Sequence, residues 1–202
     1  MRKTAFVVAV ALAVAAPAFA QTAPVADVAK VEGGHFAIDK NHAKIIFSTT
    51  HFGFSTYYGL FTDFDAKLSF DPKAPDKSAI EVTVNLNGIE TTNAKLDEHL
   101  KSPDFFDVAK FPAATFKATH IALKDGAHGT VTGDLTLHGE TRPVTLDATF
   151  NGGGVNPMTK AYVLGFNASA VLKRSEFGIK TFLPAVGDAV TLTISGEFDR
   201  VN

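Results

Sequence analysis

The chain has 202 residues, of which 46% are hydrophobic and 20% charged, and it contains 18 Phe but no Cys and no Trp. This length and apolar content are typical of one domain with a sizeable core, and they exclude a disordered chain. The lack of Cys excludes disulfide frameworks, thiolate metal sites and Cys nucleophiles, and a formal net charge of −2 argues against a broad basic face for nucleic acid.

The first 20 residues have the organisation of a secretory signal peptide. Two basic residues precede an apolar run, and the tripeptide Ala-Phe-Ala at 18–20 has the small-residue pattern of a cleavage site. The apolar run is shorter than the roughly 20 residues that span a bilayer, so a membrane anchor is less favoured. We therefore expect a signal peptide over residues 1–20, cleavage after Ala20, export to the periplasm, and a flexible lead-in over residues 21–33.

Most of the remaining chain alternates between apolar and polar residues, which predicts strands with one apolar face. The alternating segments lie at 45–51, 58–70, 80–86, 131–137, 144–150, 162–172 and 190–198, and the run at 113–123 adds an eighth strand. Turn residues separate the segments, and the Gly run at 152–154 is interpreted as a hairpin turn. Long strands with short connections predict an all-β fold, either a closed antiparallel barrel of about eight strands or a sandwich.

One segment departs from this alternation. Residues 93–101 carry Leu96 and Leu100 four positions apart among good helix formers, with Thr92 or Asn93 as the N-terminal cap. A Ser-Pro pair at 102–103 ends the pattern, because the residue before a proline disfavours helical geometry. We therefore expect a short helix near one end of the barrel.

The predicted inner faces are almost wholly apolar. An eight-stranded barrel is either filled by side chains or holds one small ligand. No alternating segment places two carboxylates, or a His and a carboxylate, on its apolar face, as a catalytic cavity normally requires. If a cavity exists, it therefore suits an alkyl or prenyl chain. The alternative, in which the Phe residues pack a solid core, stays open.

The residues that carry chemistry give only weak signals. The seven His lack the His-x-x-x-His and His-x-His spacings of metal sites, so no metal, cofactor or catalytic residue is predicted. Lys173 and Arg174 fit either an anionic head group or ordinary charges at a strand end. His51 shares a face with Ile45 and Phe47, which fits either a polar group near a cavity entrance or a hydrogen-bonded structural His.

Five segments together resemble the YceI family of bacterial secreted proteins. They are HFAID at 35–39 followed by His42, HFG at 51–53 leading to GLF at 59–61, LKSPDFFD at 100–107 running into FP at 111–112, GDLTLHGETRPV at 133–144, and RSEFG at 174–178. They occur in the family's order and cover about residues 34–200. The resemblance implies a lipocalin-like antiparallel β-barrel domain over residues 34–202, with a helix near one end.

The resemblance also implies a tunnel for a long amphiphile, namely a polyisoprenoid or a fatty acid derivative, in a periplasmic, non-enzymatic protein. Phe105, Phe106 and Phe177 belong to family motifs that look structural and would clamp loops over the barrel ends. Ligand contacts are carried over by inward face, and Arg174 is added for an anionic head group. The expected ligand-binding residues are Phe47, His51, Phe64, Leu68, Val84, Phe166, Ala168 and Arg174.

The leading hypothesis is therefore a periplasmic carrier that binds an isoprenoid or other long-chain amphiphile, with no nucleic acid partner and no membrane-spanning segment. A second hypothesis is an enzyme of lipid or isoprenoid metabolism, for which His51 is the one candidate titratable group. A third is a solid-core structural or interaction module of the envelope. A homodimer is compatible with the sequence, but no segment argues for it.

Overall fold

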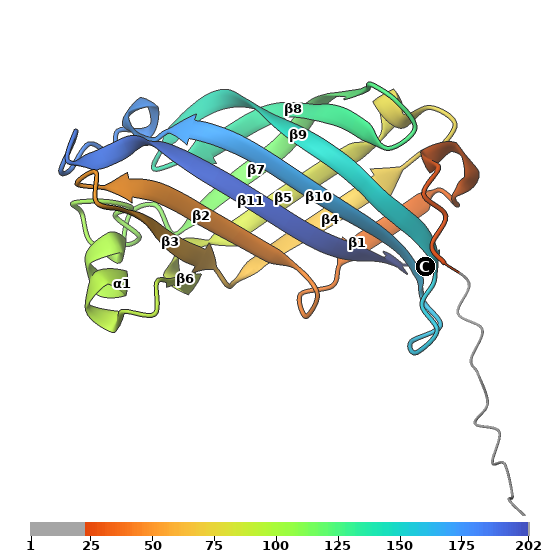
Figure 1. Cartoon of the computed structure of the whole chain (residues 1–202), viewed down its shortest axis with the longest axis horizontal. Coiled ribbons are helices and arrows are strands. Elements are labelled where there is room, and N and C mark those ends of the chain that lie inside the picture. The colour runs from red at the N-terminus through yellow and green to blue at the C-terminus, as the bar shows by residue number, and fades with distance from the viewer. Residues whose placement is uncertain (1–22, 202) are drawn as a thin grey trace, which may run out of the picture.

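The computed structural model describes residues 23–201, so the predicted signal peptide lies outside the described residues (Figure 1). Strands are the main elements of the described chain, with one α-helix and short 3-10 turns. The elements are η1 (Val28–Lys30), β1 (Gly34–Ile38), β2 (Lys44–His51), β3 (Ser55–Phe61), β4 (Phe64–Phe70), η2 (Pro75–Lys77), β5 (Ala79–Asn85), η3 (Leu86–Gly88), β6 (Ile89–Glu90), α1 (Ala94–Lys101), β7 (Ala113–Leu123), β8 (His128–Leu137), β9 (Glu140–Val155), β10 (Tyr162–Lys173), η4 (Arg174–Phe177) and β11 (Val186–Val201).

Eight of the strands close into an antiparallel barrel, which confirms the predicted fold. They pair in the order β1-β4-β5-β7-β8-β9-β10-β11, and β11 pairs back onto β1. The long strand β11 serves two partners along one edge, because Phe198–Val201 pair with β1 whereas Val186–Ser195 pair with β2. Strands β3 and β6 extend the wall from β2 toward α1, at the left end of the barrel in Figure 1.

The segment 58–70 forms two strands and not the single strand that its alternation predicts. The backbone N–H and the hydroxyl of Thr62 both donate to the Gly88 carbonyl, each at 2.8 Å, and this tether separates β3 from β4. The residues that face the interior have odd numbers in β3, before the break, and even numbers in β4, after it. In β4 the even positions are buried as predicted, but in β3 Tyr58 is exposed and Phe61 faces the interior. A single alternating strand over 58–70 would place Tyr58 on the same apolar face as Phe64 and Leu68, so the prediction is wrong at Tyr58.

The predicted helix is confirmed as α1. The side chain of Asn93 caps it by accepting a hydrogen bond from the Leu96 N–H at 3.3 Å. The carboxylate of Asp97 accepts hydrogen bonds from the N–H and the hydroxyl of Thr91, at 2.7 and 2.6 Å. These bonds hold the helix against the end of β6, and α1 lies at one end of the barrel (Figure 1).

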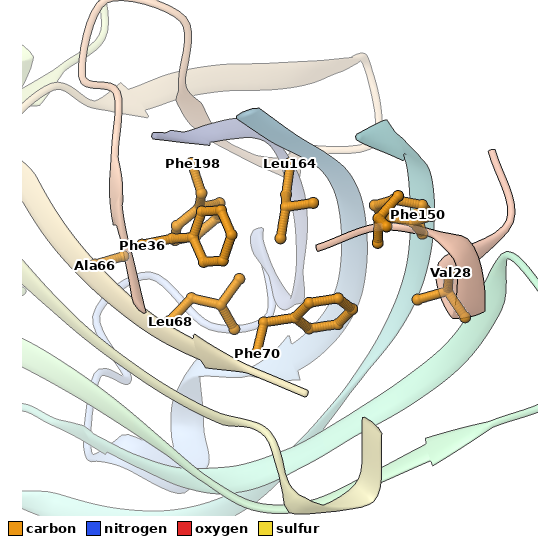
Figure 2. Close-up of a cluster of buried hydrophobic side chains, with 9 residues drawn as sticks. Val28, Phe36, Ala66, Leu68, Phe70, Phe150, Leu164 and Phe198 are labelled. Atoms are coloured by element: carbon orange, nitrogen blue, oxygen red, sulfur yellow. The ribbon is translucent and has the colours of Figure 1, made fainter. Parts of the chain in front are cut away.

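The sequence predicts a flexible lead-in over 21–33, whereas the structure packs residues 23–33 against the barrel. We call residues 23–33 the strap. Val25 and Gly153 exchange two backbone hydrogen bonds, of 2.8 and 3.0 Å, and Val28 and Val31 are buried in the main core cluster. Figure 2 shows Val28 beside Phe150 at the end of the barrel opposite α1. The cluster comprises Val28, Val31, Phe36, Ala66, Leu68, Phe70, Phe150, Leu164 and Phe198.

The Gly run at 152–154 lies inside β9, so its interpretation as a hairpin turn is wrong. A Cβ atom on Gly153 would lie 2.7 Å from Leu164 Cδ2 and 2.9 Å from Val31 Cγ1. A Cβ on Gly152, whose φ is +147°, would lie 2.8 Å from Pro24 Cβ. Because these two glycines lack side chains, the strap can pass directly over β9.

Replacing Gly153 by Val should lower the free energy of unfolding by about 1–3 kcal/mol, because the added side chain must displace Val31 or Leu164. Urea unfolding of the purified protein measures this change. The same substitution at Gly154, where a Cβ atom would meet nothing within 4 Å, is the matched control. Equal losses at the two positions would contradict a specific role for the strap contact.

Candidate ligand-binding site

The barrel encloses two apolar cavities. The first, which we call the strap cavity, has a volume of about 180 Å³ and lies beside Val28 of the strap, with walls from β1, β2, β4, β5, β7 to β11 and the β1–β2 loop. The second, which we call the helix cavity, has a volume of about 210 Å³ and lies beside Leu100 of α1. Almost every side chain that faces either cavity is aliphatic or Phe.

The two cavities adjoin along the barrel axis, because five apolar residues line both of them. These residues come from five different strands and form the boundary between the cavities. They are Ile45, Val82, Phe116, Leu146 and Ile194. The two cavities therefore follow one another inside the barrel between the strap and the helix.

Seven of the eight predicted ligand-binding residues line these cavities. Four lie around the strap cavity and three around the helix cavity, which places them along the length of the barrel. The strap cavity is lined by Phe64, Leu68, Phe166 and Ala168, and the helix cavity by Phe47, Val84 and Arg174. That they contact a ligand remains a prediction.

His51 differs from the other seven, because its exposed side chain lines neither cavity. It is the last residue of β2, where the strand runs past the cavity into the turn that leads to β3. Its ring lies against Phe52, with ring centroids 4.7 Å apart. The alternation of β2 correctly predicts that Ile45 and Phe47 face inward, but it does not show where the cavity ends.

Phe47 is positioned by a glycine on the neighbouring strand. Phe47 and Gly59 are directly opposite in the β2–β3 pair, and a Cβ atom on Gly59 would overlap the Phe47 ring. The ring therefore lies flat over Gly59 and reaches Phe61, with ring centroids 5.2 Å apart. This contact explains the glycine of the GLF segment at 59–61.

The connection between β10 and β11, residues 174–185, forms a cap over the helix cavity. Phe177 and Ile179 of the cap are buried and line that cavity. Nδ1–H of His138, in the β8–β9 turn, donates to the Phe177 carbonyl at 3.0 Å. Phe105 and Phe106, which the sequence suggested as structural clamps, line the same cavity from the segment after α1.

Arg174 anchors the cap from within. Its side chain is 7% exposed, and its guanidinium donates to the carbonyls of Ile179, Val186 and Gly187 at 3.1, 2.9 and 2.9 Å. Burial lowers the pKa of this guanidinium from its ordinary value, and the nearby charge of Asp188 opposes the shift. Among the described residues no carboxylate forms an ion pair with Arg174.

The cavity walls offer few groups for chemistry. Among the lining residues, the titratable side chains are Lys44 and Arg174, and the ammonium of Lys44 donates to the Ala43 carbonyl at 2.9 Å. Within residues 23–201 no buried side-chain nitrogen or oxygen lacks a hydrogen-bond partner. No buried side-chain polar atom among the described residues therefore calls for a polar ligand as its partner.

One group of potential metal ligands occurs in the part of the chain that the structure describes. Atoms of Asp39, His42 and Glu197 lie within 4.8 Å of one another, and none of these residues lines a cavity. His42 Nδ1 lies 2.6 Å from Asp39 Oδ2, and this hydrogen bond raises the pKa of His42 and lowers the pKa of Asp39. The hydrogen bond between Asp39 and His42 accounts for the proximity of these two groups.

No helix within residues 23–201 combines the length and the apolar content needed to cross a bilayer.

Comparison with known proteins identifies relatives over most of the chain. The model of the YceI-like domain family matches residues 36–198. A UPF0312 protein of Pseudomonas aeruginosa and protein YceI of Escherichia coli O157:H7 are each 43% identical over 164 residues, which cover 80% of this chain and 85% of each relative.

Solved structures with the same fold include a YceI protein of Campylobacter jejuni, with a TM-score of 0.69 and 29% identity over 76% of this chain and 90% of that one. A polyisoprenoid-binding domain from Saccharophagus degradans matches with a TM-score of 0.58 and 11% identity, over 84% of this chain and 100% of that one. This second likeness shows the fold alone.

Proposed function

The chain belongs to the YceI-like domain family, and on this premise we propose that it is a periplasmic, non-enzymatic carrier of a long apolar chain. The ligand would be a polyisoprenoid or a fatty acid derivative held inside the barrel. The observation that carries the proposal is the pair of adjoining apolar cavities, which share five wall residues and leave no buried polar side-chain atom unpaired among the described residues.

The energetics of such a site favour an alkyl or prenyl chain. Each methylene moved from water into an apolar interior contributes about 0.8 kcal/mol. A chain of about 20 carbons would therefore gain on the order of 10 kcal/mol after the cost of ordering it. A closed barrel whose walls are aliphatic side chains and Phe supplies this term without directional bonds, which suits a ligand of variable length.

The fold also supports the proposal by analogy. The domain from Saccharophagus degradans that shares the barrel is a polyisoprenoid-binding domain. A solid-core envelope module is less well supported, because its interior would hold side chains and no cavity. An enzyme is less well supported because His51, the candidate titratable group, lies outside both cavities.

Solvent extraction of the protein tests the proposal directly. The full-length precursor is expressed in a Gram-negative host, the exported protein is purified without detergent, and organic extracts are analysed by mass spectrometry. We expect about one lipid with a long apolar chain per protein molecule. The proposal would be contradicted by a protein that yields no lipid on extraction and binds none when it is incubated with prenyl and acyl lipids.

A further inference from the structure

The end of the barrel that holds the helix cavity carries exposed Phe side chains on two loops. Phe54, in the turn between β2 and β3, is 90% exposed, and Phe52 in the same turn is 53% exposed. Phe182 of the cap is 55% exposed. Each of these rings forgoes the gain from burial in the core, so a contact outside the barrel would account for them better than packing within it.

The two loops form one surface that is continuous with the cavity wall. The N–H of Phe52 donates to the Ala185 carbonyl at 2.7 Å, which ties the β2–β3 turn to the cap. The ring of Phe182 lies 6.2 Å from that of Phe105, centroid to centroid, and Phe105 lines the helix cavity. Figure 1 shows both loops at the end of the barrel where α1 lies.

The two loops carry few exposed charged side chains. Residues 51–58 contain no Asp, Glu, Lys or Arg, and the exposed charged residues of the cap are Glu176 and Lys180, since Arg174 is buried. Neither Glu176 nor Lys180 forms an ion pair within the described residues. Loops with exposed aromatic rings and few charged side chains match a bilayer surface, where apolar side chains reach the acyl boundary.

The opposite end of the barrel has a different character. The strap covers it with Val28, and the β4–β5 connection at 71–78 carries two acidic and two basic residues in a stretch of eight. The aromatic loops lie at the end that the strap does not cover.

We propose that this protein docks on a phospholipid bilayer through Phe52, Phe54 and Phe182, so that an apolar chain passes between the membrane and the helix cavity at this end. The inference rests on the proposed carrier function and adds its partner, a lipid surface. The occupant is a bilayer because the surface presents exposed aromatic rings and joins a cavity suited to a chain that resides in membranes.

Flotation with lipid vesicles tests the proposal. The purified exported protein is mixed with vesicles of phosphatidylethanolamine and phosphatidylglycerol at a ratio of about 3:1, and the bound fraction is measured. We expect the double variant Phe54→Ser/Phe182→Ser to lower vesicle partitioning by about tenfold or more. The matched control is Val155→Ser/Met158→Ser, because these residues are also exposed but belong to the end of β9 and the β9–β10 turn, next to the pairing of Gly153 with Val25 of the strap. The control should bind vesicles like the unaltered protein.

Three results would overturn docking: no binding by the unaltered protein, unchanged binding by the Phe variant, or equal loss in both variants. A dimer that the Phe substitutions dissociate, as measured by sedimentation, would also overturn it by assigning the surface to a second copy. Solvent extraction of the same samples keeps the two proposals separate. A protein that contains no lipid but binds vesicles through the Phe residues supports docking and counts against the carrier function. A protein that contains lipid but does not bind vesicles supports the carrier function and counts against docking.

Discussion

Replacing Leu146 by Trp is expected to empty the barrel of its apolar ligand while the protein stays folded. Leu146 lines both cavities, so a larger side chain there extends into the space that a chain must cross. Excluding about six methylenes, at about 0.8 kcal/mol each, weakens binding by roughly 5 kcal/mol, or about a thousandfold or more. The amount of extractable lipid per protein, measured by mass spectrometry, should fall from about one to near zero.

The matched control for this prediction is Val171→Trp, which adds the same side chain to an exposed position on the outer wall of β10. It should retain the ligand in full. Urea unfolding of the Leu146→Trp protein checks that the barrel persists, since the cavities offer room for the added atoms. A folded Leu146→Trp protein with undiminished lipid would show that the chain does not cross the boundary between the cavities.

Replacing Arg174 by Met should destabilise the protein by about 3 kcal/mol or more. The substitution keeps much of the apolar length of the side chain but removes the N–H groups that donate hydrogen bonds to three backbone carbonyls. Each buried acceptor left without a partner costs about 1–3 kcal/mol. The cap would be loosened first, because these carbonyls belong to the cap and to the start of β11. Urea unfolding measures the loss.

The control is Lys173→Met, which removes an exposed charge from the adjacent position and should change stability little. The loss of stability in Arg174→Lys should lie between the losses in Arg174→Met and Lys173→Met, because an ammonium cannot reproduce the planar guanidinium that reaches three carbonyls. The pair of readouts also tests the role that the sequence suggested. If Arg174→Met keeps full stability but loses an anionic lipid, Arg174 acts on a head group and not as the anchor of the cap.

The main elements of the fold were predictable because their signals are local. The alternation in β4, β5, β8, β10 and β11 requires one face to be apolar wherever the strand lies in the barrel. The helix α1 follows from its cap at Asn93 and its leucine spacing, which act within a few residues. The break at Thr62 was missed because Leu60 and Phe61 are both apolar, so either phase of alternation fits the residues before it.

The candidate site was predicted to the extent that it follows from inward faces. Phe64, Leu68, Phe166 and Ala168 line a cavity because each lies on the apolar side of a long strand. His51 shares such a face in sequence but lies past the end of the cavity, and no local pattern marks that end. Val28 was missed because a short Ala/Val segment after the expected cleavage site carries no strand or helix period.

The sequence by itself determined that this is an all-β protein whose long strands each have one apolar face, since alternation and turn residues specify strands and faces without knowledge of their partners. The choice of a closed barrel over a sandwich came from the resemblance to the YceI family. Tertiary structure decided how the barrel is closed at its ends. Val31 and Leu164 pack so close to Gly153 that a side chain there would collide with them. The guanidinium of Arg174 donates hydrogen bonds to carbonyls of both the cap and β11. These contacts join segments that are distant in the chain or that only the folded backbone brings into hydrogen-bonding distance, so they have no periodic signature.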